Sequence, residues 1–345
     1  MGYALQVDED LAGGLRRIAC EQAAQAIADL QAALAYDGPA INDGEEDVWD
    51  EGLHEARKAG KKIRAVARLC RDALGDDYAR INQQFRDASR LLSDVRDGYA
   101  LVGTAAALDE SLLSVDTREE LRRTLFERYV NKRDYSRATQ LLPQALQAFR
   151  DAAADIPQWP LPVDLAPAEL APSIGRVYRR GQQGWHYAQD TAGDYTDAAT
   201  EQWHDWRKRV KYLRYHADLL SPAQPQALSA LEEELHRLSD ALGDDHDLAV
   251  LLQTVRAERL LGPEATERLA ASVATRQGKL RGEALQIAAP LYRESPTVFI
   301  RRMVDARRLG RAGRRLVSSV KEVGRAGVGF ALSLGVSVFR RLFRG

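Results

Sequence analysis

The chain contains two copies of a short basic motif, His-x-x-Arg-Lys-x-x-Lys-x-x-Arg, placed 150 residues apart. The members are His54, Arg57, Lys58, Lys61 and Arg64 in the first copy, and His204, Arg207, Lys208, Lys211 and Arg214 in the second. On a helix, at about 100° per residue, these side chains share one face, and apolar side chains occupy the opposite face. Each motif therefore predicts a helix that packs on its apolar side and presents a cationic stripe on the other.

Neighbouring cations of one sign are the unusual feature of each stripe. Arg57–Lys61 and Lys61–Arg64 are one helical turn apart, so each pair costs roughly 0.2–0.5 kcal/mol. A repulsion kept in both copies predicts an anion that relieves it; a solvated basic surface is the plainer alternative. Arginine offers forked contacts and lysine a compact charge, which together suit phosphate groups. Four further cations are predicted as secondary anion contacts: Arg16, Arg17, Arg179 and Arg180.

The offset of 150 residues extends beyond the two motifs. It relates Leu92 to Leu242, Arg96 to His246 and Asp97 to Asp247. A shared register over this distance predicts an internal duplication of a helical unit. Arg96 and His246 thus join the candidate anion-binding residues, and the two aspartates are expected to orient the cations through ion pairs.

The histidines also permit a different chemistry. His54, His204, His246 and Asp247 could bind a divalent metal, because imidazole and carboxylate are common metal ligands. A metal-dependent phosphohydrolase is therefore the alternative function. Against it, His54 and His204 lie among cations, and the counterpart of His246 is Arg96, which cannot bind a metal. We interpret the histidines as phosphate contacts and assign no catalytic residue, metal or cofactor.

The rest of the chain has helical character. Apolar residues recur with helical spacing, and no alternating strand pattern is found, so the predicted fold class is all-α. One helix is expected to end near Tyr36, with loosening at Gly13 and Gly14. The other predicted helices cover about 48–73, 77–106, 117–153, 173–192, 197–220, 223–242, 246–261 and 263–289.

Proline and charge divide the chain. Five of the 12 prolines fall between residues 157 and 172, where helices cannot continue. The predicted parts are a first bundle (1–156), a linker (157–172), a second bundle (173–295) and a tail (296–345). Residues 301–345 hold 12 lysines and arginines against two acidic residues, although the net charge of the whole chain is -1.

The tail combines this charge with a short apolar run. Residues 326–339 are too few to span a bilayer, which needs about 20. We expect an interaction tail that contacts a membrane surface or another polyanion, and an inert extension is the alternative. The N-terminus lacks a signal-peptide pattern, so a cytoplasmic location is expected. Cys20 and Cys70 are interpreted as buried, unpaired thiols.

At these motifs the sequence resembles the CHAD family, the conserved histidine α-helical domain. The matching elements are the two basic motifs, Leu92-Ser-Asp-Val-Arg96-Asp97 and Leu242-Gly-Asp-Asp-His246-Asp247, and the resemblance covers about residues 8–290. It implies two pseudo-symmetric four-helix bundles around a basic central cavity that binds inorganic polyphosphate, often at polyphosphate granules. The resemblance is to a stand-alone member without a CYTH domain, and it does not imply catalytic activity. Few aromatic residues interleave with the stripes, so no specific nucleic-acid partner is expected.

Overall fold

The computed structural model describes residues 2–6, 9–40, 47–108, 114–221 and 225–304. This part of the chain is built from helices and contains no strand, which confirms the all-α prediction. The α-helices are α1 (Leu11–Ala35), α2 (Val48–Leu69), α3 (Arg71–Leu74), α4 (Asp77–Arg90), α5 (Ser93–Ala106), α6 (Val115–Ala138), α7 (Leu141–Ala154), α8 (Ala171–Asp190), α9 (Asp197–Leu220), α10 (Pro225–Glu258) and α11 (Pro263–Arg293). Two short 3-10 helices, η1 (Ile156–Gln158) and η2 (Pro167–Leu170), lie in the proline-rich linker.

Several helix boundaries differ from the sequence prediction, and the predicted helix 48–73 is divided into α2 and α3. The predicted helix 77–106 is divided into α4 and α5, where the hydroxyl groups of Ser89 and Ser93 donate to backbone carbonyls one turn earlier. The predicted helix 117–153 is divided at Gln140, whose φ of 56° is left-handed. In contrast, α10 continues through Gly243, because Leu242 and Leu248 on either side are held in the core.

The first helix is regular where loosening was expected. Asp10 caps α1 by accepting a hydrogen bond from the Gly13 backbone nitrogen at 2.6 Å. Gly13 and Gly14 therefore lie in the first turn, where their low helix propensity matters least. Of the two cysteines, Cys70 is buried as predicted, whereas Cys20 is half-buried.

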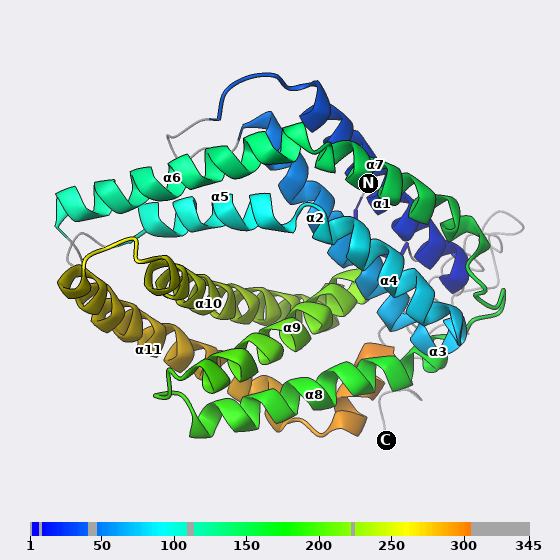
Figure 1. Ribbon diagram of the computed structural model, residues 1–345. Coiled ribbons are helices and arrows are strands. Elements are labelled where there is room, and N and C mark those ends of the chain that lie inside the picture. The colour runs from blue at the N-terminus through cyan, green and yellow to red at the C-terminus, as the bar shows by residue number, and fades with distance from the viewer. Residues whose placement is uncertain (1, 7–8, 41–46, 109–113, 222–224, 305–345) are drawn as a thin grey trace, which may run out of the picture.

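The two parts of the chain lie on opposite sides of a central contact (Figure 1). Helices α1, α2 and α4–α7 lie toward the upper part of the view and α8–α11 toward the lower part, with α3 at the lower right beside α8. Helix α2 packs against α9, and α5 packs against α10. His216 of α9 is fully buried and lies 3.2 Å from the carbonyl oxygen of Ala65 in α2, measured from Nε2. Leu5 extends the contact, since its backbone nitrogen donates to the Leu219 carbonyl. The internal duplication and its pseudo-symmetry stay predictions.

The apolar sides of α2 and α9 are buried as their periodicity predicts. Ile63 and Val66 of α2, and Trp206, Val210 and Leu213 of α9, have almost no exposed surface. Burying side chains of this size stabilises the fold by roughly 1.5–3 kcal/mol each. The opposite faces of α2 and α9, which carry the motifs, are thereby turned toward the contact between the two parts of the chain.

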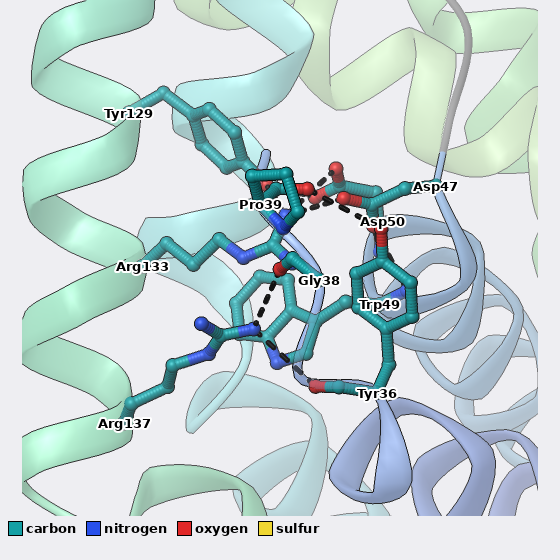
Figure 2. Close-up of polar contacts among 9 residues, drawn as sticks. All are labelled: Tyr36, Gly38, Pro39, Asp47, Trp49, Asp50, Tyr129, Arg133 and Arg137. Atoms are coloured by element: carbon teal, nitrogen blue, oxygen red, sulfur yellow. Dashed lines mark hydrogen bonds and ion pairs between the residues drawn. The ribbon is translucent and has the colours of Figure 1, made fainter. Parts of the chain in front are cut away.

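A buried arginine fixes the start of α2 (Figure 2). Asp47 caps this helix by accepting hydrogen bonds from the backbone nitrogens of Trp49 and Asp50. The same carboxylate accepts from Arg133 of α6 at 2.6 Å, and Arg133 also donates to the Gly38 carbonyl at 3.2 Å. The guanidinium group lies 4.6 Å from the Trp49 ring centre. Helix α2 is thus held at its N-terminus, which fixes the position of the first basic motif.

A second buried arginine acts in the same way on α9 and α10. Arg281 of α11 donates to Asp245 of α10 at 2.9 Å and to the carbonyl oxygen of Asp194 at 2.7 Å. Its guanidinium group lies 4.7 Å from the ring centres of both Tyr195 and Trp203. The segment that precedes α9 is therefore held by α11, as the segment before α2 is held by α6.

The tail begins later than residue 296. Residues 296–304 are helical, and Phe299 and Met303 are fully buried. The Phe299 ring stacks on Tyr178 of α8, with the ring centres 4.0 Å apart. The predicted boundary is corrected accordingly, because these residues belong to the core. Residues 305–345 lie outside the described residues, and no helix within the described part is long and apolar enough to cross a membrane.

Candidate anion-binding site

The packing of α2 against α9 brings cations of the two basic motifs together. The guanidinium groups of Arg57 and Arg207 both lie close enough to Lys61 to lower its pKa, and Lys61 in turn lowers the pKa of Lys211. Helices α5 and α10 add the other predicted positions, Arg96 and His246. The two motifs, 150 residues apart in the sequence, thus contribute to one cationic region.

A pocket of about 540 Å³ lies between α2, α5, α9 and α10. Eight of the twelve predicted site residues line it: Arg57, Lys61, Arg64, His204, Arg207, Lys208, Lys211 and His246. Asp97 and Asp247 are the acidic residues in its wall. Arg57 pairs with Asp97 at 3.2 Å, which confirms the predicted orienting role of that aspartate. The pocket therefore carries a large excess of positive charge.

Four buried nitrogen atoms of pocket-lining residues have no hydrogen-bond partner within the described part of the chain. They are Arg57 Nη1, Arg207 Nε, His204 Nδ1 and His246 Nδ1. A buried polar atom without a partner costs roughly 1–3 kcal/mol. The arginine nitrogens are donors, and a neutral imidazole nitrogen donates in one of its two tautomers. A ligand rich in oxygen acceptors would satisfy all four.

The pKa values of the two lysines in the pocket are lowered toward neutral pH. Burial, then Arg57 and Arg207, lowers the pKa of Lys61 to about 8. Burial, then Arg207 and Lys61, lowers the pKa of Lys211 to about 7. Neither lysine makes an ion pair with a described residue. The Lys61 side chain is enclosed by the walls of the pocket but remains accessible to solvent through its opening, whereas Lys211 is half-buried. An anionic ligand would restore the protonated form of both groups.

His204 and His246 form a stacked pair in the same pocket. Their ring centres are 4.0 Å apart and the planes differ by 25°. Burial and the neighbouring His246 lower the pKa of His204 to about 3, and burial with Arg207 lowers the pKa of His246 to about 4. Both rings are therefore neutral near pH 7. In the first half, the corresponding pair is a contact of 3.1 Å between His54 Nδ1 and Arg96 Nη2.

The remaining four predicted residues lie outside this pocket. His54 contacts Arg96, which lines a neighbouring pocket of about 750 Å³. Lys58 pairs with Glu55 at 2.9 Å. Arg214 contacts the Ser239 hydroxyl at 3.4 Å and has two aspartates within 4 Å. These groups border the cationic region, and internal partners already satisfy part of their charge.

The predicted secondary contacts are only partly placed near the pocket. Arg16 donates to the carbonyl oxygens of Trp159 and Leu161, each at 2.8 Å, and so fastens the linker. Arg17 pairs with Glu9 and Glu21. We correct the assignment of both as anion contacts, because acceptors within the protein occupy their guanidinium groups.

The two exposed arginines of α8 point in different directions. The guanidinium group of Arg179 lies over Gly175 beside Ile300 and does not line the pocket, so its assignment is also corrected. Arg180 lies near Arg209 of α9. Burial lowers the pKa of Arg209, and the charges of Arg180 and of Arg68 in α2 lower it further. Arg180 is thus the one predicted secondary contact that lies beside cations of α2 and α9.

Comparison with known protein families decides the identity of the fold. The pattern of the CHAD domain matches residues 21–256, which is more than half of the chain. The chain belongs to the CHAD family. A crystal structure of the CHAD domain from the plant Ricinus communis is similar, with a TM-score of 0.46 and 18% identity, over 89% of this chain and 95% of that chain. None of the curated proteins matches the chain.

The neighbouring pocket of this CHAD chain contains cations that the sequence reasoning missed. Arg276 and Lys279 of α11 line it together with Arg96 and Asp244, and it shares Asp247 with the first pocket. Their one-turn spacing is visible in the sequence. The search by repeat could not find them, because the positions 150 residues earlier hold Phe126 and Tyr129.

The side chains of the Asp244-Asp245-His246-Asp247 segment point in different directions around α10. Asp245 is buried against Arg281, whereas His246 stacks on His204. Adjacent residues of a helix point about 100° apart, so Asp245 and His246 cannot converge on one ion. Within the described residues, no group of three or more histidine, cysteine, aspartate or glutamate side chains could hold a metal ion. No observation on these side chains favours the metal-dependent alternative.

Proposed function

We propose that the pocket between α2, α5, α9 and α10 binds inorganic polyphosphate. The observation that carries this proposal is the set of buried, unpartnered nitrogens in a cationic wall where Lys61 and Lys211 make no ion pair with a described residue. Phosphate oxygens accept several hydrogen bonds at once. They also carry negative charge, and Lys61 and Lys211 have no negatively charged partner among the described residues. Polyphosphate would therefore relieve both unfavourable features of the pocket, the unpartnered nitrogens and the repulsion between its cations.

The linear arrangement of the cations favours a chain of phosphates over a single phosphate group. Arg57, Lys61 and Arg64 cover eight residues of one helix, a rise of about 10 Å over seven steps of 1.5 Å. Arg207 and Lys211 add cations from α9. A repeating anion can use the successive cations of both helices, whereas orthophosphate reaches only a few of them. Tyr212 and Tyr215 are the aromatic residues in the wall, too few for an extended base-stacking surface.

The proposal is tested by charge reversal at the centre of the pocket. The double variant Lys61→Glu/Lys211→Glu should lose retention on immobilised polyphosphate and keep the helical circular dichroism spectrum. Lys58→Glu is the matched control, since Lys58 lies on α2 outside the pocket. Retention that survives the double reversal would refute the assignment. For the wild type, binding should weaken steeply with salt, because counterions condensed on the polyanion are released.

We further propose that the protein binds polyphosphate without hydrolysing it and associates with polyphosphate granules in the cytoplasm. The absence of phosphate release from polyphosphate with Mg²⁺ or Mn²⁺ is the expected result. Release that disappears in His246→Ala would establish the phosphohydrolase alternative instead. A fluorescent fusion should coincide with stained granules, and the Lys61→Glu/Lys211→Glu variant should not.

The basic tail is proposed as a separate contact with membrane surfaces or other polyanions. Its test is deletion of residues 305–345, because residues 296–304 pack in the core and must be kept. We expect loss of binding to anionic vesicles and intact binding to polyphosphate. Unchanged vesicle binding would show that the tail has no such role.

A further inference from the structure

Three arginines gather where α2, α8 and α9 meet, next to the proposed pocket. They are Arg68 of α2, Arg180 of α8 and Arg209 of α9, and the three helices pack against one another. Burial lowers the pKa of Arg209, and the positive charges of Arg180 and Arg68 lower it further. None of the three makes an ion pair with a residue in the described part of the chain. We call this group the outer arginine cluster.

The arrangement of Arg68 shows that the cluster is held in place. Its guanidinium group lies 3.9 Å from the ring centre of Tyr212, a stacking contact that fixes its plane. Its Nε atom is buried and has no hydrogen-bond partner. A guanidinium group that is positioned by an aromatic ring and lacks an internal acceptor is prepared for an external one.

The acidic residue near the cluster is already engaged. Asp205, which opposes the effect of Arg180 on Arg209, pairs with Lys208 at 2.9 Å. The burial of Arg209 and the crowding of the arginines therefore remain costs of the unliganded protein. Because the cluster lies beside the proposed anion-binding pocket, this unfavourable arrangement indicates that the cluster binds an anion.

The outer arginine cluster is continuous with the pocket. Tyr212 lines the pocket and also stacks on Arg68. Arg64 lines the pocket too. Burial lowers the pKa of Arg64, and the charge of Arg68 lowers it further, against the opposing effect of Tyr212 and Tyr78. A ligand that leaves the pocket past Arg64 and Tyr212 would next meet Arg68, and then Arg209 and Arg180.

We propose that the outer arginine cluster binds the part of a long polyphosphate chain that extends beyond the pocket. This inference rests on the proposed function and adds a second site, which gives the protein a preference for chains longer than the pocket can hold. Short chains fill the pocket alone. Long chains occupy the pocket and the cluster together.

The test compares tripolyphosphate with long-chain polyphosphate. Arg180→Ala/Arg209→Ala should weaken long-chain binding roughly tenfold and lower the salt dependence by about one per arginine, because two phosphate contacts are lost. Binding of tripolyphosphate should change less than about twofold, since it does not reach the cluster. Arg179→Ala is the matched control. It removes the same charge from α8, but the Arg179 guanidinium group lies over Gly175 and not in the cluster.

Distinct outcomes overturn the inference and the proposed function. Equal weakening of both ligands in Arg180→Ala/Arg209→Ala, or of neither, overturns the cluster and leaves the pocket assignment standing. An equal effect of Arg179→Ala does the same. If the wild type binds neither ligand, the proposed function itself fails. Loss of DNA or RNA binding in place of long-chain polyphosphate binding would assign the cluster to nucleic acid and overturn the inference.

Discussion

Polyphosphate binding should weaken as the pH rises from 6 to 9, because the two pocket lysines must be protonated in the complex. In the free protein the pKa of Lys211 is lowered to about 7 and that of Lys61 to about 8. A bound anion raises both pKa values, so binding takes up protons wherever the free lysine is neutral. Affinity is therefore greatest below pH 7 and falls as the pH passes the pKa of each free lysine.

The size of this effect follows from proton linkage. A lysine with a pKa of about 7 that must be charged in the complex reduces the affinity up to about 90-fold between pH 6 and pH 9. A pKa of about 8 gives up to about tenfold. The share of Lys61 is the smaller one in practice, because its solvent exposure screens the neighbouring charges.

The assay is the dissociation constant of labelled polyphosphate, measured at constant ionic strength across this pH range. In Lys61→Arg/Lys211→Arg the profile should flatten, because arginine stays charged throughout. Comparison with the wild type removes the titration of the ligand's own phosphates. Lys58→Arg, outside the pocket, should keep the wild-type profile. Identical profiles for the wild type and the double arginine variant would refute the reasoning.

Three other predictions concern single features of the structure. His246→Phe should keep the stack on His204 and weaken polyphosphate binding roughly tenfold, through loss of the buried Nδ1 atom that lacks a partner in the unliganded protein, as measured by titration. Arg133→Met should lower the free energy of unfolding in urea by about 3–5 kcal/mol, because Asp47 is left buried without its partner, and Asp47→Asn in the same chain should recover part of it. Burial lowers the pKa of His216 to about 3, so wild-type stability is complete above the unfolded pKa of about 6.5 and falls below it by up to about 1.4 kcal/mol per pH unit. His216→Gln should reduce this acid sensitivity in urea titrations at pH 7 and pH 5, and an unchanged dependence would contradict it.

The fold class and the central residues of the candidate site could be predicted from the sequence, because both depend on periodicity. A helical period with a cationic face and an apolar face fixes which side of α2 packs inward, and the structure buries Ile63 and Val66 accordingly. The same period predicts that Arg57 and Lys61 share a face. The repeat of the motif then added Arg207 and Lys211, which the structure places in the same pocket.

Other features depend on packing between distant segments and could not be predicted in this way. The occupation of Arg16 by Trp159 and Leu161 requires α1 to meet the linker, which no local pattern indicates. The break at Gln140 depends on a left-handed backbone conformation at a residue type with no strong preference for it. Arg133 lies in a helix rich in charged residues, where no local pattern singles it out, and the structure buries it completely against Asp47.

The most direct test of the central claim is a crystal structure of the protein with bound polyphosphate. The ligand should lie between α2, α5, α9 and α10. Its oxygens should be within hydrogen-bond distance of Arg57 Nη1, Arg207 Nε and the Nδ1 atoms of His204 and His246, the nitrogens that now lack partners. Polyphosphate bound elsewhere on the protein, with these four nitrogens still unpaired, would contradict the account.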